Sequence, residues 1–254
     1  MPYTLTETPP ELENADNLGP GDGSNRWTLN FGPQHPATHT TLRLVLELDG
    51  ERVVECTPHI GYLHSGFEKL MEHLNYNQYV TIVDRMDYSA PIYNELAWHL
   101  ATEKLMGIEL TPRCTYLRTL LSEYSRLADH LTCIAAGLME LGAMTAFLYL
   151  VMMRDWIYEH LADLTGARVT YSYGRIGGLA RDLPANWLAR LEEILGRYNE
   201  FVGRVHGLVD RNRIFIDRMR DVGVLTTADA IDWGYTGPIL RSTGVPRDLR
   251  KDTP

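Results

Sequence analysis

The sequence predicts an α+β fold, in which a small N-terminal antiparallel β-sheet precedes a bundle of long helices. In residues 42–48, leucines alternate with Arg43, Val45 and Glu47, which is the period of a strand that buries one face. Beyond residue 64, apolar residues recur at steps of three and four through several long segments, the period of amphipathic helices. The chain has 254 residues, of which 44% are hydrophobic and 22% charged, enough for one large or two ordinary domains.

The chain divides into four predicted segments. Residues 1–26 are acidic, rich in Pro and Gly, and without the apolar stretch of a secretory signal, so we expect a flexible tail. Residues 27–64 form the β domain, residues 65–221 the helical bundle, and residues 222–254 an irregular segment with scattered Gly and Pro. Because the last residues are charged and end no periodic element, we interpret the chain as an interrupted one.

The β domain is predicted from a hairpin. The alternating leucines lead into Asp49-Gly50, a dipeptide typical of a tight hairpin turn. Residues 51–57 then return as a second strand.

The helices are predicted from their apolar stripes and their end signals. A short helix presents Phe67, Leu70, Met71 and Leu74 on one face. The longer helices are expected over residues 91–106, 112–142, 145–164 and 184–213, the first and third closed by Gly107 and Gly166. The helix from residue 112 is long enough for a bundle core. Between the last two, YSYGRIGGLARDLP has the glycines of a loop.

Composition excludes several classes of function. The net charge is −9 and the basic residues are scattered, so the sequence lacks the basic surface of a nucleic-acid-binding protein. Cys56, Cys114 and Cys133 are far apart and form no C-x-x-C pair, which favours reduced structural thiols over a zinc or iron-sulfur site. The most apolar window, residues 138–153, is short and contains Glu140, so it predicts a buried helix rather than a membrane span. We expect a soluble or peripheral protein in a reducing compartment.

Two histidines four residues apart, His35 and His39, precede the hairpin. On a helix they would share a face and could chelate a metal ion, but Pro36 and the threonines of residues 38–41 disfavour a helix. In an extended segment four residues span about 13 Å, too far for one ion. A loop of Gly, Pro and His on a rigid scaffold is better suited to line a pocket.

A second histidine motif, HIGYLHSGFEKL, adds His59, His64 and Glu68. His64 and Glu68 would share a face of a helix. The alternative is a capping arrangement with Ser65 or a surface pair, and both interpretations stay open.

Two further candidates carry acid–base chemistry. The segment DRMDYSAPIYNE is rich in charges, a pattern typical of a solvated face, but Tyr88 lies among apolar residues beside a helix start, and a buried Tyr needs a hydrogen-bond partner. Tyrosine and histidine together can donate protons to a carbonyl oxygen that is being reduced. Glu140 lies in an apolar stretch at a helix end, and it either pairs with a histidine or faces water.

Nucleotide and acyl-transfer motifs do not occur in the sequence. There is no phosphate-binding G-x-x-x-x-G-K-[ST] loop and no serine-nucleophile elbow. GRIGGLA, at residues 174–180, is superficially like a dinucleotide loop, but no predicted strand precedes it.

Several motifs, taken together, resemble one family. FGPQHPATH, HIGYLHSGFEK, DRMDY, ELGAMTAF, YSYGRIGGLARDLP and GPILRSTGV follow one another from about residue 28 to residue 254. They strongly resemble the D subunit of the respiratory NADH:quinone oxidoreductases (complex I), which is related to the large subunit of nickel-iron hydrogenases. The resemblance implies a hydrogenase-like fold and a chain that lacks the C-terminal third of the family.

The resemblance implies the roles of particular residues. His39 and Tyr88 match the groups that hydrogen-bond the quinone carbonyls, and His35 lies in the same cavity loop. Glu140 stands where the family usually has an aspartate paired with that histidine. Thr40 replaces a usual glycine, and Ser65 stands where many members have arginine. The N-terminal C-x-x-C pair with which the hydrogenases hold their metals is absent, so we expect no metal site in this chain.

The resemblance also implies partners. Quinone is the substrate, and the terminal 4Fe-4S cluster lies in the adjacent subunit, with NAD and FMN elsewhere in the complex. The homologue of the C subunit and the quinone-channel membrane subunit are neighbours. The chain is expected to be peripheral on the cytoplasmic side of the inner membrane, or on the matrix side in mitochondria. Two alternatives remain: a relative fed by ferredoxin or a deazaflavin, and a catalytically silent scaffold, favoured if Glu140 and Thr40 have dismantled the site.

Overall fold

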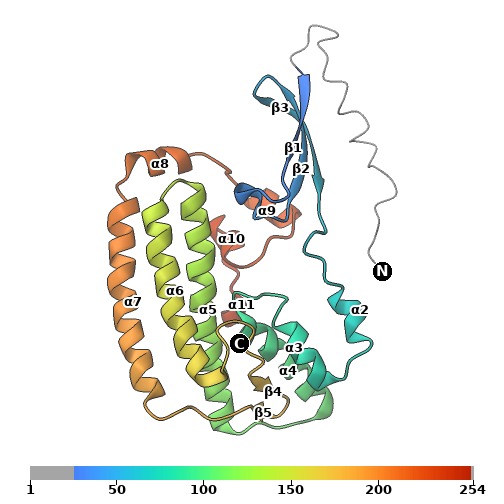
Figure 1. The fold of residues 1–254 in the computed structure, drawn as a ribbon, viewed down its shortest axis with the longest axis vertical. Helices are drawn as coiled ribbons and strands as arrows, with labels where there is room; N and C mark the ends of the chain where they lie inside the picture. Colours follow the sequence, from blue (N-terminus) through green and yellow to red (C-terminus); the bar gives the residue numbers. More distant parts are fainter. Residues whose placement is uncertain (1–25, 253–254) are drawn as a thin grey trace. The chain divides into compact units, whose positions relative to one another are not determined.

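The computed structural model describes residues 26–252, which belong to two compact units with a boundary between His73 and Leu74. We call them unit 1 and unit 2. The predicted acidic tail lies outside the described residues except for Arg26. The α+β class is confirmed, since an antiparallel sheet is followed by helices (Figure 1).

Unit 1 contains a three-stranded antiparallel sheet in the order β1-β2-β3, with β1 at Arg26–Phe31, β2 at Arg43–Asp49 and β3 at Arg52–His59. The predicted hairpin is confirmed: Leu46 pairs with Cys56, and Gly50 turns the chain at φ 62°. The first strand was not predicted. The expected buried face is only partly present, because Leu48 is buried and the other leucines of β2 are half-buried. A short helix, α2 (Phe67–Met71), follows the sheet.

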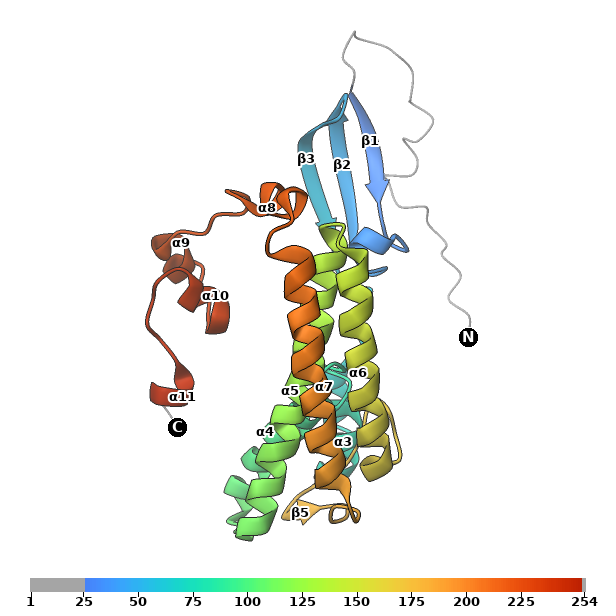
Figure 2. The same cartoon turned by 90° about the vertical axis from the view of Figure 1, so that its left-hand side faces the viewer.

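Unit 2 is built on three long helices that lie side by side in Figures 1 and 2: α5 (Pro112–Glu140), α6 (Met144–Thr165) and α7 (Trp187–Val209). Their facing side chains form one core that includes Leu121, Leu161 and Leu164. Before them come α3 (Tyr76–Val83) and α4 (Pro91–Met106), and α4 packs on α5. Two two-residue strands, β4 (Gly174–Arg175) and β5 (Gly178–Leu179), form a small hairpin in the loop between α6 and α7.

The end signals explain where the helices lie. Pro91 begins α4, and Gly107 ends it in the left-handed region at φ 67°, as predicted. Gly166 ends α6 in the same way at φ 84°. The predicted helix over residues 184–213 is confirmed as α7, except that it ends earlier, at Val209. Asn212 is the N-cap of the next helix, α8 (Arg213–Met219), because its side chain accepts the N–H groups of Ile214 and Phe215.

The sequence pattern did not predict the short helices. Residues 222–254 were predicted to be irregular, yet they contain α9 (Thr227–Asp232), α10 (Gly237–Ser242) and α11 (Leu249–Asp252). None of these exceeds six residues, so an apolar stripe has no room to repeat. Helix α3 was also missed, although its start can be recognised in the sequence. Asn75 and Gln78 have the spacing of a capping box, and the structure contains this box.

Candidate functional site

The histidine loop of unit 1 is packed closely on itself. A Cβ atom at Gly32 would overlap the Leu42 carbonyl oxygen and the Thr38 side chain, so only glycine fits there. Residues Pro36–Thr38 form a single turn of 3-10 helix, and Thr38 is buried, its hydroxyl donating to the His35 carbonyl oxygen at 2.9 Å. The loop is thus a defined scaffold for its two histidines.

The two histidines have different structural roles. His35 precedes the helical turn, and its Nδ1 accepts the N–H of Ala37 at 3.1 Å while its ring lies 4.5 Å from that of Phe31. His39 ends the turn in the left-handed conformation, at φ 50° and ψ 33°, with an exposed side chain. The predicted absence of a helix that carries both is confirmed. His35 therefore shapes the loop, and His39 presents its imidazole at the surface of unit 1.

The second histidine motif does not form the arrangement that was considered. His64 lies in a turn before α2, with its N–H bonded to the Gly61 carbonyl oxygen, so His64 and Glu68 do not share a helix face. Capping by Ser65 is also wrong, because Gly66 is the N-cap residue and the Ser65 hydroxyl donates to the Leu63 carbonyl oxygen.

In unit 2, Tyr88 lies in the turn between α3 and α4. Asp87 shapes this turn, since its Oδ1 accepts the N–H groups of Ser89 and Ala90. The Tyr88 side chain is 58% exposed, contrary to the expectation of a buried tyrosine, and its hydroxyl makes no hydrogen bond within the described residues. The hydroxyl is therefore available to a ligand.

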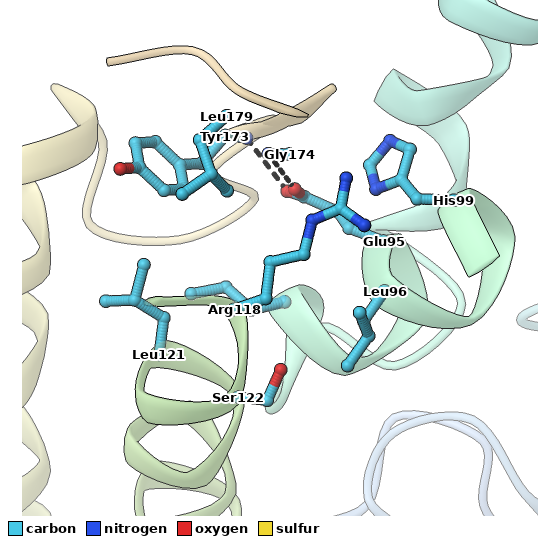
Figure 3. A pocket seen from close by; sticks show the side chains of 10 residues that line it. Glu95, Leu96, His99, Arg118, Leu121, Ser122, Tyr173, Gly174 and Leu179 are labelled. Atoms are coloured by element: carbon cyan, nitrogen blue, oxygen red, sulfur yellow. Dashed lines mark hydrogen bonds between the residues drawn. The ribbon is translucent and has the colours of Figure 1, made fainter. Parts of the chain in front are cut away.

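Glu140 is the last residue of α5 and is exposed. Its exposure does not decide between the two alternatives of a paired and a water-facing carboxylate. Its pairing with His39 stays a prediction, as does a common cavity with Tyr88. Neither Tyr88 nor Glu140 lines the small cavity of unit 2 shown in Figure 3.

Sequence reasoning missed a set of buried carboxylates that bind the loop between α6 and α7. Asp84 Oδ2 accepts the N–H of Ser172 at 2.6 Å. Glu95 accepts the N–H groups of Tyr173 and Gly174, one on each carboxylate oxygen (Figure 3). Asp84 is 0% and Glu95 1% exposed. In the segment DRMDYSAPIYNE, the charged residues were expected to be exposed and Tyr88 to be buried. The structure shows the opposite, because Asp84 and Glu95 are buried and Tyr88 is exposed.

A third carboxylate, Glu103, binds the far end of the same loop through Gly177, whose N–H lies 2.7 Å from Oε1. Arg118 of α5 holds Glu103 with two hydrogen bonds of 2.7 and 2.8 Å and also donates to the carbonyl oxygens of Arg175 and Gly178. Burial alone would raise the pKa of Glu103, but the hydrogen bonds from Arg118 and Gly177 bring it below its ordinary value. We call Asp84, Glu95 and Glu103 the carboxylate cradle.

His99 lies between the two glutamates on α4 and is 1% exposed. Burial, reinforced by the Arg118 charge, lowers the pKa of His99 to about 4, so the ring is neutral at physiological pH. Glu95, His99 and Glu103 follow one another at steps of four, which places them on one face of α4. That spacing is the signal in the sequence that could have revealed the cradle.

The close packing of the cradle leads to a test. A Cβ atom at Gly174 would overlap both Glu95 and His99, whereas one at Gly178 meets nothing within 4 Å. We expect Gly174→Ala to lower the free energy of unfolding by about 1–3 kcal/mol, as overpacking does in a tight core. Urea unfolding of the full chain measures this, with Gly178→Ala as the matched control. Equal midpoints for the two variants would contradict the cradle geometry.

Residues 26–252 contain neither a metal-ligand cluster nor a membrane-spanning helix. No group of three His, Cys, Asp or Glu side chains there is placed to hold a metal ion. No helix in that range has the length and apolarity needed to cross a membrane.

Comparison with known proteins gives a consistent result. Residues 140–254 match the family model described as the 49 Kd subunit of respiratory-chain NADH dehydrogenase. The chain is 58% identical over 238 residues to the D subunit of NADH-quinone oxidoreductase from Pelobacter propionicus, an alignment that covers 94% of this chain and 59% of that relative. It is 43% identical to the D subunit from Methylacidiphilum infernorum, over 98% of this chain and 60% of the relative. For Citrifermentans bemidjiense the identity is 48%, over 89% of this chain and 58% of the relative. The chain thus spans about three fifths of the length of these curated relatives.

Proposed function

We propose that the chain belongs to the family of the D subunit of NADH-quinone oxidoreductase and that it serves the quinone site of a proton-pumping NADH:quinone oxidoreductase. The observation that carries the proposal is the 58% identity over 94% of the chain. The cavity in which quinone is reduced is formed together with the neighbouring subunit that carries the terminal 4Fe-4S cluster. Because the electrons arrive from that neighbour, the chain alone has no activity.

His39 and Tyr88 are the proposed quinone ligands, one for each carbonyl oxygen of the headgroup. Reduction of a quinone to a quinol takes two electrons and places one proton on each of these oxygens. A histidine and a tyrosine can each donate such a proton. Two features support the assignment: the Tyr88 hydroxyl has no hydrogen bond within the described residues, and His39 is exposed on a tightly packed loop.

Glu140 is proposed as the partner of His39. A carboxylate beside a histidine stabilises the imidazolium form, which is the proton donor. Glutamate has one methylene more than the aspartate that is usual in the family, so it reaches further from the end of α5. Its side chain is exposed at the end of α5, which is compatible with a partner outside that helix.

The proposed setting is the peripheral arm of the complex, on the cytoplasmic side of the inner membrane. There the chain contacts the cluster-bearing subunit, the homologue of the C subunit and the quinone-channel membrane subunit. Large apolar side chains exposed within each unit support burial against neighbours, among them Ile60 at 85% and Trp233 at 81% exposure. The relatives are D subunits of NADH-quinone oxidoreductases, which favours NADH as the electron source over ferredoxin or a deazaflavin.

The role of His39 can be tested in the assembled complex with His39→Asn. Asparagine tolerates the left-handed backbone of this position, so the loop is preserved while the imidazole is lost. We expect NADH:quinone reduction to fall about tenfold or more, since a positioned proton donor contributes about 10²–10⁴-fold. NADH oxidation by an artificial acceptor, which bypasses the quinone, should not change.

The matched control is His206→Asn, at an exposed histidine of α7 that pairs with Asp210. Normal quinone reduction in His39→Asn would contradict the assignment. A loss shared by both histidine variants would do the same, because it would show a general sensitivity of the complex to such changes. Full activity of both variants would favour the silent scaffold.

A further inference from the structure

The buried acids Asp84 and Glu95 have four carboxyl oxygens between them, and three of these have a donor. Asp84 Oδ2 accepts from Ser172, and the two oxygens of Glu95 accept from Tyr173 and Gly174. The fourth oxygen, Asp84 Oδ1, is buried and has no N–H or hydroxyl partner within the described residues. A buried polar atom without a partner costs about 1–3 kcal/mol, so this oxygen requires an explanation.

The two carboxyl groups lie close together, because they accept the N–H groups of three consecutive residues, Ser172, Tyr173 and Gly174. Neither side chain is exposed by more than 1%. Two ionised carboxylates at this distance repel each other strongly, and a carboxylate offers no hydrogen to donate. A single proton resolves both problems, because it removes one charge and turns the orphan oxygen into a donor.

The surrounding charges do not offer a different solution. Arg118 is engaged with Glu103, and His99 on α4 is neutral at physiological pH. Arg85, next to Asp84 in the chain, is exposed, and it lowers the pKa of Asp84 less than the Ser172 N–H does. Arg175 of the loop is exposed and donates to the carbonyl oxygens of Ser172 and Gly174 rather than to the acids. Tyr171 and Tyr173 of the loop both have a raised pKa and are therefore uncharged.

We propose that Asp84 and Glu95 form a proton-binding site, in which the two carboxyl groups share one proton at neutral pH, carried on Asp84 Oδ1 and donated to Glu95. The inference concerns unit 2 alone and stands without the proposed quinone role. Burial, followed by the contact with Glu95, raises the pKa of Asp84 to about 8, in agreement with this arrangement.

A small cavity lies beside Glu95. The cavity in Figure 3 has a volume of about 10 Å³ and is lined by Glu95, His99, Arg118 and Ser122, among others. His99 Nε2, Arg118 Nε and Ser122 Oγ have no partner within the described residues. Room for about one water with three polar atoms around it fits a bound water molecule, which can exchange protons with the pair.

Loss of the proton has a structural consequence. Two negative charges in contact push apart, and the loop amides that the acids accept, those of Ser172 to Gly174, become less protected. Ser172 already has a strained left-handed backbone, at φ 42°, which only the surrounding contacts maintain. Deprotonation therefore loosens this end of the loop.

Infrared spectroscopy of the full chain tests the site directly. At pH 7 the carbonyl band of a protonated carboxyl group should be present in the wild type and should fade as the pH rises through about 8. The Asp84→Asn variant, which keeps the shape of the neutral acid, should lose the band. Asp232→Asn, at an exposed aspartate of α9, should keep it. A wild-type minus Asp84→Asn difference spectrum without this band would overturn the proposal.

The pH dependence of stability gives a second readout. The folded state binds the proton more tightly than the unfolded chain, whose aspartate has a pKa near 3.8. The stabilisation is therefore complete below pH 3.8 and is lost as the pH rises through about 8. The urea midpoint of the wild type should decline over this window more steeply than that of Asp84→Asn.

Hydrogen exchange tests the proposal in the wild-type chain alone. In the wild type, protection of the amides of Ser172 to Gly174 should fall more steeply above pH 8 than that of amides in α6. Parallel behaviour of the loop and of α6 would show that no buried group titrates there, and would overturn the proposal even if Asp84→Asn did not fold.

Discussion

Tyr88→Phe is expected to lower NADH:quinone reduction by the assembled complex about 10²-fold, the lower end of the effect of a positioned proton donor. The substitution removes only the hydroxyl, and that hydroxyl makes no hydrogen bond within the described residues. Because no contact in that part of the chain depends on it, the free energy of unfolding should stay within about 0.5 kcal/mol of the wild type. The loss is therefore a loss of substrate chemistry.

Two assays on the same preparation measure this effect. NADH oxidation with a quinone acceptor should fall, and oxidation with an artificial acceptor should not. Tyr116→Phe is the matched control, since Tyr116 is a 77% exposed tyrosine on α5. Equal loss of both activities in Tyr88→Phe would indicate misassembly and contradict a role at the quinone.

Arg118→Met is expected to destabilise unit 2 by about 3–5 kcal/mol. The side chains of Arg118 and Glu103 are only 6% and 4% exposed, and removing the cation leaves Glu103 charged and buried without its partner. The carbonyl oxygens of Arg175 and Gly178 also lose their donor. Urea unfolding followed by helical circular dichroism measures the change.

The chain contains a matched control for this buried pair. Arg113 and Asp182 also form two hydrogen bonds, of 2.8 and 3.0 Å, but both side chains are more than half exposed. Arg113→Met should leave the unfolding midpoint almost unchanged, because exposed ion pairs contribute little. In addition, Glu103→Gln/Arg118→Met should cost less than the sum of the two single changes. Additive costs would mean that the two side chains do not act as a pair.

The elements that the sequence predicted correctly are those with local signals. The β2–β3 hairpin follows from alternation and an Asp-Gly turn, and α4 from a proline at its start and a glycine just past its end. The end of α7 at Val209 was predicted a turn too late, because the residue that starts the next helix, Asn212, acts through a single side chain that accepts two N–H groups. Helices of six residues or fewer, such as α9, are too short for an apolar stripe to repeat, so the sequence does not predict them.

The carboxylate cradle was missed for a different reason, although the spacing of Glu95, His99 and Glu103 marks one face of α4. A charged side chain in a sequence is read as exposed unless a partner is known, and the partners of Asp84 and Glu95 are backbone N–H groups almost eighty residues or more away. Backbone donors leave no mark on the sequence. Tyr88, in contrast, was assigned through the family resemblance. Its exposure in the structure agrees with a ligand role but was not foreseen from its apolar neighbours.

The most direct test of the central proposal is photolabelling of the assembled complex with a quinone analogue, followed by mapping of the labelled peptides. The proposal predicts label in the peptides that contain His39 and Tyr88, reduced by an excess of unmodified quinone. Label confined to other peptides or to neighbouring proteins of the complex, in a complex that still reduces quinone, would contradict it.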